Sequence, residues 1–264
     1  MGIPTLLGIA WDKSSSFQRG PAEAPSAIRA ALQSDSTNWF TESLRDLGAH
    51  GVLEDSGDIV PGDSTVREDI ERAVESLLQR GRTPILLGGD HSITYPAVRA
   101  FRGRQPFALL HFDAHPDLYP DFQGDRFSHA CPFARIMEEG LPAELVQVGI
   151  RTMSAPQAAQ VERFGVKVVG PAEWERGWEF SSNLPVYLSI DVDVLDPAYA
   201  PGVSHPEAGG CSTRLLLSTL QRIRNPIIGA DIVELNPAND AAGLTARVAA
   251  KLVKEVADLI LGNN

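Results

Sequence analysis

The chain has 264 residues, 43% of them hydrophobic and 22% charged, with no low-complexity tract, collagen-like period or solenoid repeat, so it reads as an ordinary globular chain. Its formal net charge is -11 and its lysines and arginines form no basic stripe, which argues against nucleic-acid and membrane-surface partners. The two cysteines, Cys131 and Cys211, lie far apart in no CxxC pattern, so the sequence suggests neither a disulfide framework nor a thiolate metal site.

The N-terminal stretch MGIPTLLGIAWDK has no basic region, and its apolar run is too short for a signal peptide or a membrane span. Reduced thiols and the lack of an export signal in this stretch together predict a cytoplasmic location.

Short apolar runs alternate with longer amphipathic segments along the rest of the chain. The runs predict strands at 4–10, 83–89, 107–113, 144–150, 166–170, 185–191 and 226–234. Apolar residues at helical spacing predict helices at 66–80, 128–140, 212–223 and 244–262. This alternation indicates an α/β fold in which helices cover both sides of a mainly parallel sheet, in a single domain spanning residues 1–264.

Acidic residues and histidines follow four of these predicted strands. His91 follows the predicted strand at 83–89, and Asp113 stands at the end of the one at 107–113. Asp191 and Asp193 end and follow the strand at 185–191, and Glu234 ends the strand at 226–234. Ligands of open parallel sheets bind beyond the carboxyl ends of the strands. The chemistry of this protein is therefore expected at that edge of the sheet.

The segment DAHPD places Asp113, His115 and Asp117 at alternating positions, so an extended backbone would project all three to one side. Asp191 and Asp193 repeat this alternation. Taken singly, each motif has a plain structural interpretation, such as a turn, a helix cap or a hydrogen-bonded histidine. Four buried carboxylates together would require compensating cations, and two divalent ions would balance them. Oxygen ligands with two imidazoles and no thiolate favour a manganese-like ion.

Seven motifs together resemble the ureohydrolase family of arginases and agmatinases, and most closely the plant-type arginases of its agmatinase-like branch. They are GGDHS, HFDAHPD, SHACPFARIMEEG, VGIR, SIDVDVLDP, APGVSHPEAGG and GADIVELNP, and the likeness covers essentially the whole chain. The resemblance implies a three-layer α/β/α arginase-like fold with about eight strands, assembled as a trimer or hexamer. It also implies two Mn2+ per chain, one bound by His91, Asp113, Asp117 and Asp191, the other by His115, Asp113, Asp191 and Asp193.

The activity implied is hydrolysis of a guanidino compound, L-arginine or agmatine, to urea and ornithine or putrescine by a hydroxide that bridges the metals. Asp117, His129 and Glu234 are the predicted catalytic residues, with Glu234 holding the guanidinium and His129 shuttling protons. Ser128, His129 and Glu234 are predicted to contact the substrate. The plain alternatives are a surface position for Glu234 and a helix-terminal hydrogen bond for His129, since Ser128 and His129 are expected to open the helix that runs to Glu139.

The guanidino substrate stays open between several members of the family. Animal-type arginases carry an Asp soon after GLR and an Asn before the shuttle histidine, whereas this chain has residues 152–154 (TMS) and 126–128 (RFS) there. Plant-type arginases share both departures, so arginine is not excluded. Arg126 or His205 could meet a substrate carboxylate, and the loop 118–128 is expected to select the substrate. His111 is expected to support the ligands without binding metal.

Three further alternatives remain at this point. Guanidinobutyrate, guanidinopropionate or formiminoglutamate could replace arginine and agmatine as the substrate. A regulatory protein with a relict site is a second alternative, and a deacetylase-like hydrolase with one metal ion is a third.

Overall fold

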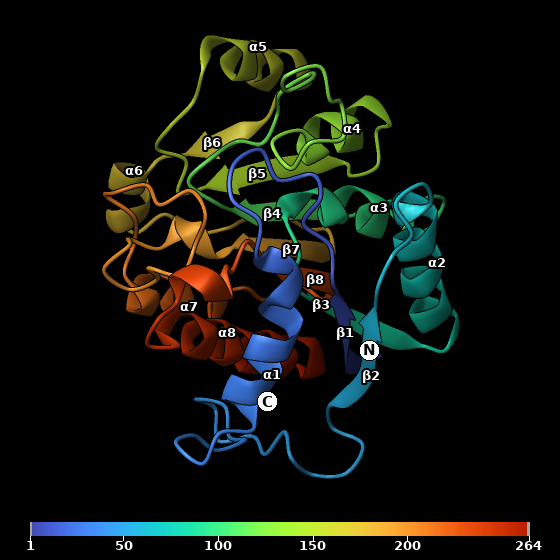
Figure 1. Ribbon diagram of the computed structural model, residues 1–264, viewed down its shortest axis with the longest axis vertical. Helices are drawn as coiled ribbons and strands as arrows, with labels where there is room; N and C mark the ends of the chain where they lie inside the picture. Colours follow the sequence, from blue (N-terminus) through green and yellow to red (C-terminus); the bar gives the residue numbers. More distant parts are fainter. Residues whose placement is uncertain (1, 263–264) are drawn as a thin grey trace.

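An eight-stranded sheet, in which every neighbouring pair is parallel, forms the centre of the protein (Figure 1). The computed structural model describes residues 2–262. The strands are β1 (Ile3–Ile9), β2 (Glu54–Ile59), β3 (Arg82–Leu87), β4 (Ala108–Phe112), β5 (Glu144–Val148), β6 (Lys167–Val169), β7 (Val186–Asp191) and β8 (Ile227–Val233). They lie in the order β2-β1-β3-β8-β7-β4-β5-β6. The predicted α/β fold with a parallel sheet of about eight strands is confirmed.

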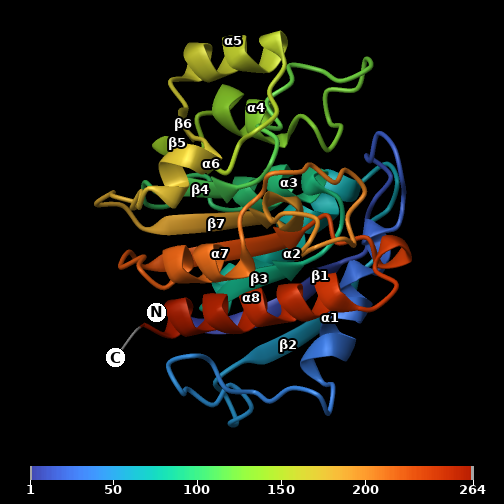
Figure 2. The same ribbon diagram turned by 90° about the vertical axis from the view of Figure 1, so that its left-hand side faces the viewer.

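Helices cover both faces of the sheet, as Figure 2 shows for the layer that contains α8. One layer holds α1 (Ala24–Leu32), α6 (Pro171–Glu175), α7 (Thr213–Leu220) and α8 (Leu244–Leu261). The other holds α2 (Val66–Gln79), α3 (Thr94–Arg99), α4 (Pro132–Glu138) and α5 (Ala155–Phe164). Consecutive strand residues point to opposite layers, so Leu86 packs in one hydrophobic cluster and Leu87 in the other.

The edge strand β2 was not predicted from the sequence. Its sequence, EDSGDI, has four consecutive exposed residues and no apolar run, because β2 pairs only with β1 at the border of the sheet. Its acidic side chains pair with arginines of α1 and β3, namely Asp55 with Arg29 and Glu54 with Arg82. Charged residues on an edge strand also discourage pairing with another sheet.

Helix α4 begins later than predicted. The expected helix started at Ser128, whereas α4 starts at Pro132, where a fixed φ and the missing N–H suit the first helical position. Ser128 and His129 therefore lie in the preceding loop, and the His129 N–H donates to the Ser14 carbonyl at 3.1 Å.

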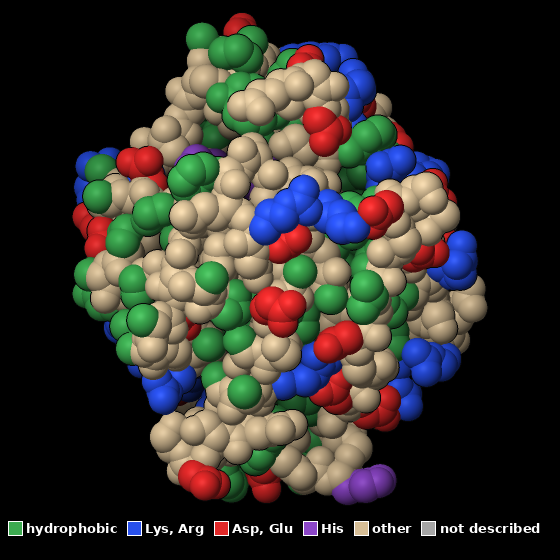
Figure 3. All heavy atoms as spheres, viewed as in Figure 1, with side chains coloured by type: hydrophobic (Ala, Val, Ile, Leu, Met, Phe, Trp, Pro, Cys, Tyr) green, Lys and Arg blue, Asp and Glu red, His purple; other side chains and the backbone are tan. Residues whose placement is uncertain are grey.

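None of the helices described is long and apolar enough to cross a membrane. On the face drawn in Figure 3, basic and acidic side chains are interspersed, so charge of one sign does not gather there.

Candidate metal centre

The site lies where four adjacent strands end. The sheet order places β3, β8, β7 and β4 side by side, and these are the strands followed by the predicted site residues. His91, Asp113, Asp191 and Glu234 are consequently neighbours, although up to 143 positions separate them in the chain. All four side chains are buried.

Tight turns, and not an extended backbone, bring the acidic side chains together. β4 ends at Phe112, the His115 N–H donates to Asp113 Oδ1 at 2.6 Å, and Asp117 has a left-handed φ of 49°. After β7 the chain enters a 3₁₀ turn, in which the Asp193 N–H donates to Asp191 Oδ1 at 2.8 Å. The predicted alternation along a strand was therefore wrong in its geometry, although the residues it grouped do converge.

The first group of side chains surrounds His91. Its Nδ1 lies 3.2 Å from one carboxylate oxygen of each of Asp113, Asp117 and Asp191. This buried nitrogen has no hydrogen-bond partner among the described residues. This group consists of His91 and the three carboxylates, which are the four residues predicted to bind one of the two ions.

A buried chain of hydrogen bonds places a proton on Nε2 of His91. Ser189 Oγ donates to Asp231 Oδ1 at 2.7 Å, so the contact of 2.9 Å between Ser189 and His91 must be donated by His91 Nε2. Burial lowers the pKa of His91, but Asp113, Asp117 and Asp191 outweigh it and raise that pKa well above its ordinary value, so in the metal-free protein Nδ1 also carries a proton. A metal ion bound between Nδ1 and the three carboxylates would replace that proton.

The second group surrounds His115. Its Nδ1 lies 3.0 Å from Asp193 Oδ2 and 3.4 Å from Asp113 Oδ1, and its side chain is 28% exposed. Asp113 belongs to both groups, because its Oδ2 faces His91 while its Oδ1 faces His115. The geometry therefore offers two neighbouring oxygen-rich positions that share one carboxylate.

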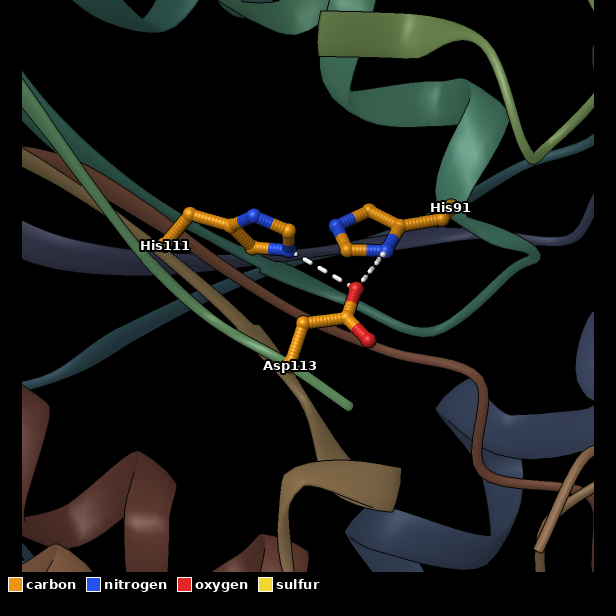
Figure 4. A group of neighbouring side chains, drawn as sticks. All are labelled: His91, His111 and Asp113. Carbon is orange, nitrogen blue, oxygen red and sulfur yellow. Dashed lines mark hydrogen bonds and ion pairs between the residues drawn. The ribbon is translucent and has the colours of Figure 1, made fainter. Parts of the chain in front are cut away.

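His111 supports Asp113, and Figure 4 shows its ring next to that of His91, with both rings directed toward the Asp113 carboxylate. The Gln147 amide donates to His111 Nδ1 at 3.0 Å, which leaves the proton on Nε2, 2.8 Å from Asp113 Oδ2. This ring is buried and stacks on Phe133. With both nitrogens engaged, His111 has no lone pair to offer an ion.

The charge of the cluster also fits a bound cation. Burial, together with repulsion from Asp193 and Asp113, raises the pKa of Asp191 well above its ordinary value. Burial and the charge of Asp113 raise the pKa of Asp193 to about 6. Asp191 therefore retains a proton near neutral pH unless positive charge is added, whereas neighbouring histidines hold the pKa of Asp113 well below its ordinary value despite burial. A divalent ion would displace the proton of Asp191.

A cavity of about 330 Å³ opens above the two groups. Its lining contains the predicted residues His115, Asp117, His129, Asp191, Asp193, His205 and Glu234. It also contains Ser16, Tyr119, Phe122, Ala130, Thr152, Met153, Ser154 and Gln157. The volume suits a small molecule, and no described lysine or arginine contributes to the wall.

Two predicted substrate contacts lie outside this cavity. Ser128 is buried beside a separate small cleft near Arg67, and its hydroxyl donates to the Ser14 carbonyl at 3.5 Å. Arg126 forms an exposed ion pair with Glu138. The geometry therefore gives neither side chain a contact with a molecule in the cavity.

His129 and Glu234 form a buried pair at the wall of the cavity. His129 Nδ1 lies 2.8 Å from Glu234 Oε1, which also accepts the His91 N–H at 2.8 Å. Burial lowers the pKa of His129, but the Glu234 carboxylate outweighs it and raises that pKa to about 9. His129 Nε2 lies 2.8 Å from the Ser16 hydroxyl. Ser16 was missed from the sequence, because only the fold brings its loop to His129.

The backbone of Glu234 is in an uncommon conformation. Its φ is 65°, a left-handed value that non-glycine residues adopt rarely and at a cost of about 1–3 kcal/mol. Because the side chain is only 5% exposed, the plain interpretation of Glu234 as a surface residue is excluded. The strained backbone turns its carboxylate back toward His91 and the cavity.

Comparison with known proteins reveals relatives along nearly the full chain. The model described as Arginase family matches residues 4–258. Arginase 1, mitochondrial, of Arabidopsis thaliana is 43% identical over 96% of this chain and 80% of its own length. Agmatinase of Bacillus subtilis is 32% identical over 95% of this chain and 89% of its own. The solved structure of arginase from Medicago truncatula has a TM-score of 0.92 at 42% identity and covers 98% of this chain and 87% of that chain.

The predicted cytoplasmic location is contradicted by these comparisons. Similar arginases from Arabidopsis, Medicago and rice are named mitochondrial, and a second Arabidopsis arginase is named chloroplastic/mitochondrial. Composition and unpaired cysteines predict only the solvent conditions in which the fold is stable. Both the interior of an organelle and the cytosol can meet those conditions, so composition alone does not distinguish the two locations.

Proposed function

The chain belongs to the arginase family, and from that membership we propose that it hydrolyses L-arginine or agmatine to urea and a primary amine with two manganese ions. The observation that carries the proposal is His91 Nδ1, which lies 3.2 Å from one oxygen of each of three buried carboxylates beneath a cavity whose wall includes Glu234. The amine product would be ornithine from arginine or putrescine from agmatine.

The two groups of side chains would each hold one ion. His91, Asp113, Asp117 and Asp191 would bind the buried ion, and His115, Asp113, Asp191 and Asp193 the more exposed one. Oxygen-rich ligands without a thiolate suit manganese better than a structural zinc ion. Two bound ions would supply hydroxide at neutral pH, because coordination lowers the pKa of water from about 15.7 toward about 7.

Glu234 would hold the guanidinium of the substrate. Its contacts with His91 and His129 both use Oε1, so Oε2 makes no hydrogen bond to another described residue. A guanidinium forms strong charge-assisted bonds with a carboxylate in such a position. Since the left-handed backbone of Glu234 fixes its direction, the reacting carbon would be held toward the carboxylate cluster.

His129 would deliver a proton to the departing amine. The raised pKa, about 9, keeps this imidazole protonated near neutral pH. An amine leaves readily only after it has gained a proton, and a cavity-lining cation beside Glu234 would lie close to the leaving nitrogen of a bound guanidinium. Ser16 would hold the other ring nitrogen and so fix the plane of the ring.

L-arginine is the first candidate substrate, because the relatives at 42–44% identity are arginases. Agmatine is the second, since an agmatinase matches at 32% identity over 95% of the chain. The outer wall, with Tyr119, Thr152, Ser154 and Gln157, offers neutral hydrogen-bonding groups that can accept either tail.

A urea-release assay on manganese-loaded protein with arginine, agmatine and guanidinobutyrate side by side tests this proposal. We expect urea from arginine or agmatine and close to two manganese ions per chain by mass spectrometry. Glu234→Gln is the matched control, since it keeps the size of the side chain and should bind both ions without releasing urea. Two bound ions without urea from any of the three compounds would contradict the function, and one zinc ion would favour a deacetylase-like hydrolase.

A further inference from the structure

Arg151, the last residue of the VGIR motif, follows β5 and takes no part in the reaction proposed above. Its guanidinium forms no ion pair with a carboxylate among residues 2–262. It donates instead to five backbone carbonyls, those of Gly149 (3.4 Å), Asp193 (2.6 Å), Val194 (3.2 Å), Leu195 (3.4 Å) and Glu207 (2.7 Å). An arginine committed to loop carbonyls has a positional role, because each bond specifies where a backbone segment lies.

Three of the hydrogen bonds around Arg151 close a ring. The Arg151 backbone N–H donates to the Ala114 carbonyl at 3.0 Å. The Ala114 N–H donates to Asp193 Oδ1 at 3.1 Å, and Arg151 Nη2 donates to the Asp193 carbonyl at 2.6 Å. This ring joins the end of β5, the segment after β4 and the turn after β7.

The ring constrains the distance between Asp193 and His115, two of the predicted ligands. Ala114 lies between Asp113 and His115, and its N–H occupies one oxygen of Asp193. The other oxygen, Oδ2, is left 3.0 Å from His115 Nδ1. If Arg151 releases the turn, Asp193 can move away from His115. Arg151 makes no hydrogen bond to His91, Asp117 or Asp191. Its connection to the His91 group runs through the Asp193 N–H, which donates to Asp191 Oδ1 at 2.8 Å, so the loss of Arg151 should affect the His91 group less than the His115 group.

We propose that Arg151 is a positioning residue for the ion on the His115 side, and that it joins the DAHPD segment to the turn that carries Asp193. The same guanidinium binds the Glu207 carbonyl and so holds the loop of His205, a residue of the cavity wall, against this turn. The inference rests on the proposed two-ion centre, but it does not depend on which guanidino compound is the substrate.

Manganese titration of Arg151→Met and Arg151→Lys, with mass spectrometry and electron paramagnetic resonance as readouts, tests the inference. Loss of a residue that orients a ligand lowers metal affinity by about 10–100-fold. We expect this loss for one ion only, so the spectrum should change from a coupled pair to a single manganese ion. Arg151→Lys keeps the charge but has a single nitrogen, so it should resemble Arg151→Met.

Arg45→Met is the matched control. Arg45 is also partly buried, pairs with Asp258 at 2.7 Å and donates to the Gly262 carbonyl, but it lies between α1 and β2 and contacts α8, away from the site. This variant should unfold at a lower temperature and still bind both ions with unchanged affinity. A general loss of stability is thereby separated from a selective loss at the His115 side.

Amide exchange in the metal-free proteins gives a readout that needs neither metal nor substrate. Exchange at Ala114 should rise in Arg151→Met and stay unchanged in Arg45→Met. The inference is overturned if Arg151→Met binds both ions as tightly as the wild type, or if both ions weaken equally. A wild-type chain that binds fewer than two ions would contradict the proposed function instead, and exchange at Ala114 would then decide on Arg151.

Discussion

The two halves of the candidate metal centre use similar donors but are held in different ways. The His91 half is buried and is supported by side chains of adjacent strands, with Ser189 of β7 and Asp231 of β8 directly paired in the sheet. The His115 half is 28% exposed at its imidazole and is supported by backbone hydrogen bonds between loops, with Arg151 at their junction. Support from a sheet is rigid, whereas support from loops depends on a few bonds that one substitution can remove.

Replacing Asp113, a carboxylate that faces the histidine of each half, should have the largest effect. Asp113→Asn removes a charge that faces His91 with one oxygen and His115 with the other. We expect both ions to be lost and urea release to fall to background, as measured by mass spectrometry and the urea assay.

Asp193→Ala separates the two halves. It removes a contact of His115 and leaves the three carboxylates around His91 in place. This variant should retain the buried ion, lose the exposed one and release no urea. An Asp193→Ala chain that releases urea and binds two ions would contradict the assignment of Asp193 and His115 to the more exposed ion.

A pH-dependent stability difference should appear in the metal-free protein. Burial and Asp113 raise the pKa of Asp193 to about 6, so the folded state binds this proton more tightly than the unfolded state. The contribution of Asp193 to stability therefore falls as the pH rises from its ordinary pKa toward about 6, and it stays low above that. Asp193→Asn should stabilise the metal-free chain at pH 7.5 by up to about 3 kcal/mol.

Denaturant unfolding at several pH values checks the sign of this effect. The gain from Asp193→Asn should disappear below about pH 4, where the aspartate is protonated in both states. With manganese present, the order of stability should reverse, because the wild type binds the second ion. A stability difference that does not vary with pH would contradict the raised pKa.

Ser189→Ala should weaken the His91 half alone. It leaves His91 Nε2 and Asp231 without their shared partner, and loss of such support costs about 10–100-fold in metal affinity. Manganese titration should therefore show the buried ion weakened and the exposed ion nearly unchanged, the opposite of Arg151→Met. Equal weakening of both ions would mean that the two halves are not independent.

The smallest effect is expected from the cavity wall, which belongs to neither half. Gln157 lines the cavity and caps α5 by accepting hydrogen bonds from Ser154. Gln157→Leu should keep both ions and change the KM for the preferred substrate by about 2–10-fold, the worth of one hydrogen bond. A loss of metal in this variant would show that the wall and the metal centre are coupled.

Apolar runs and the residues that follow them were sufficient to predict most of the sheet and the edge of the sheet at which the candidate site lies. Seven of the eight strands coincide with such runs. The acidic residues and the histidine that follow β3, β4, β7 and β8 could also be recognised one by one. β2 escaped, because an edge strand needs no apolar run. The short helices α1, α3, α5 and α6 were not predicted either, since few turns carry little periodic signal.

The sequence by itself determined which donors this protein carries and that they stand at strand ends, because hydrophobic periodicity and local order are written in neighbouring residues. Only the tertiary structure decided how those donors meet. The order β3-β8-β7-β4 places His91 beside Ser189 and Asp113, tight turns replace the expected extended backbone, and the loop before α4 carries Ser128 away from the cavity. The ring through Ala114, Arg151 and Asp193 likewise joins positions up to 79 residues apart. Such contacts depend on which strands become neighbours, and no local pattern records that.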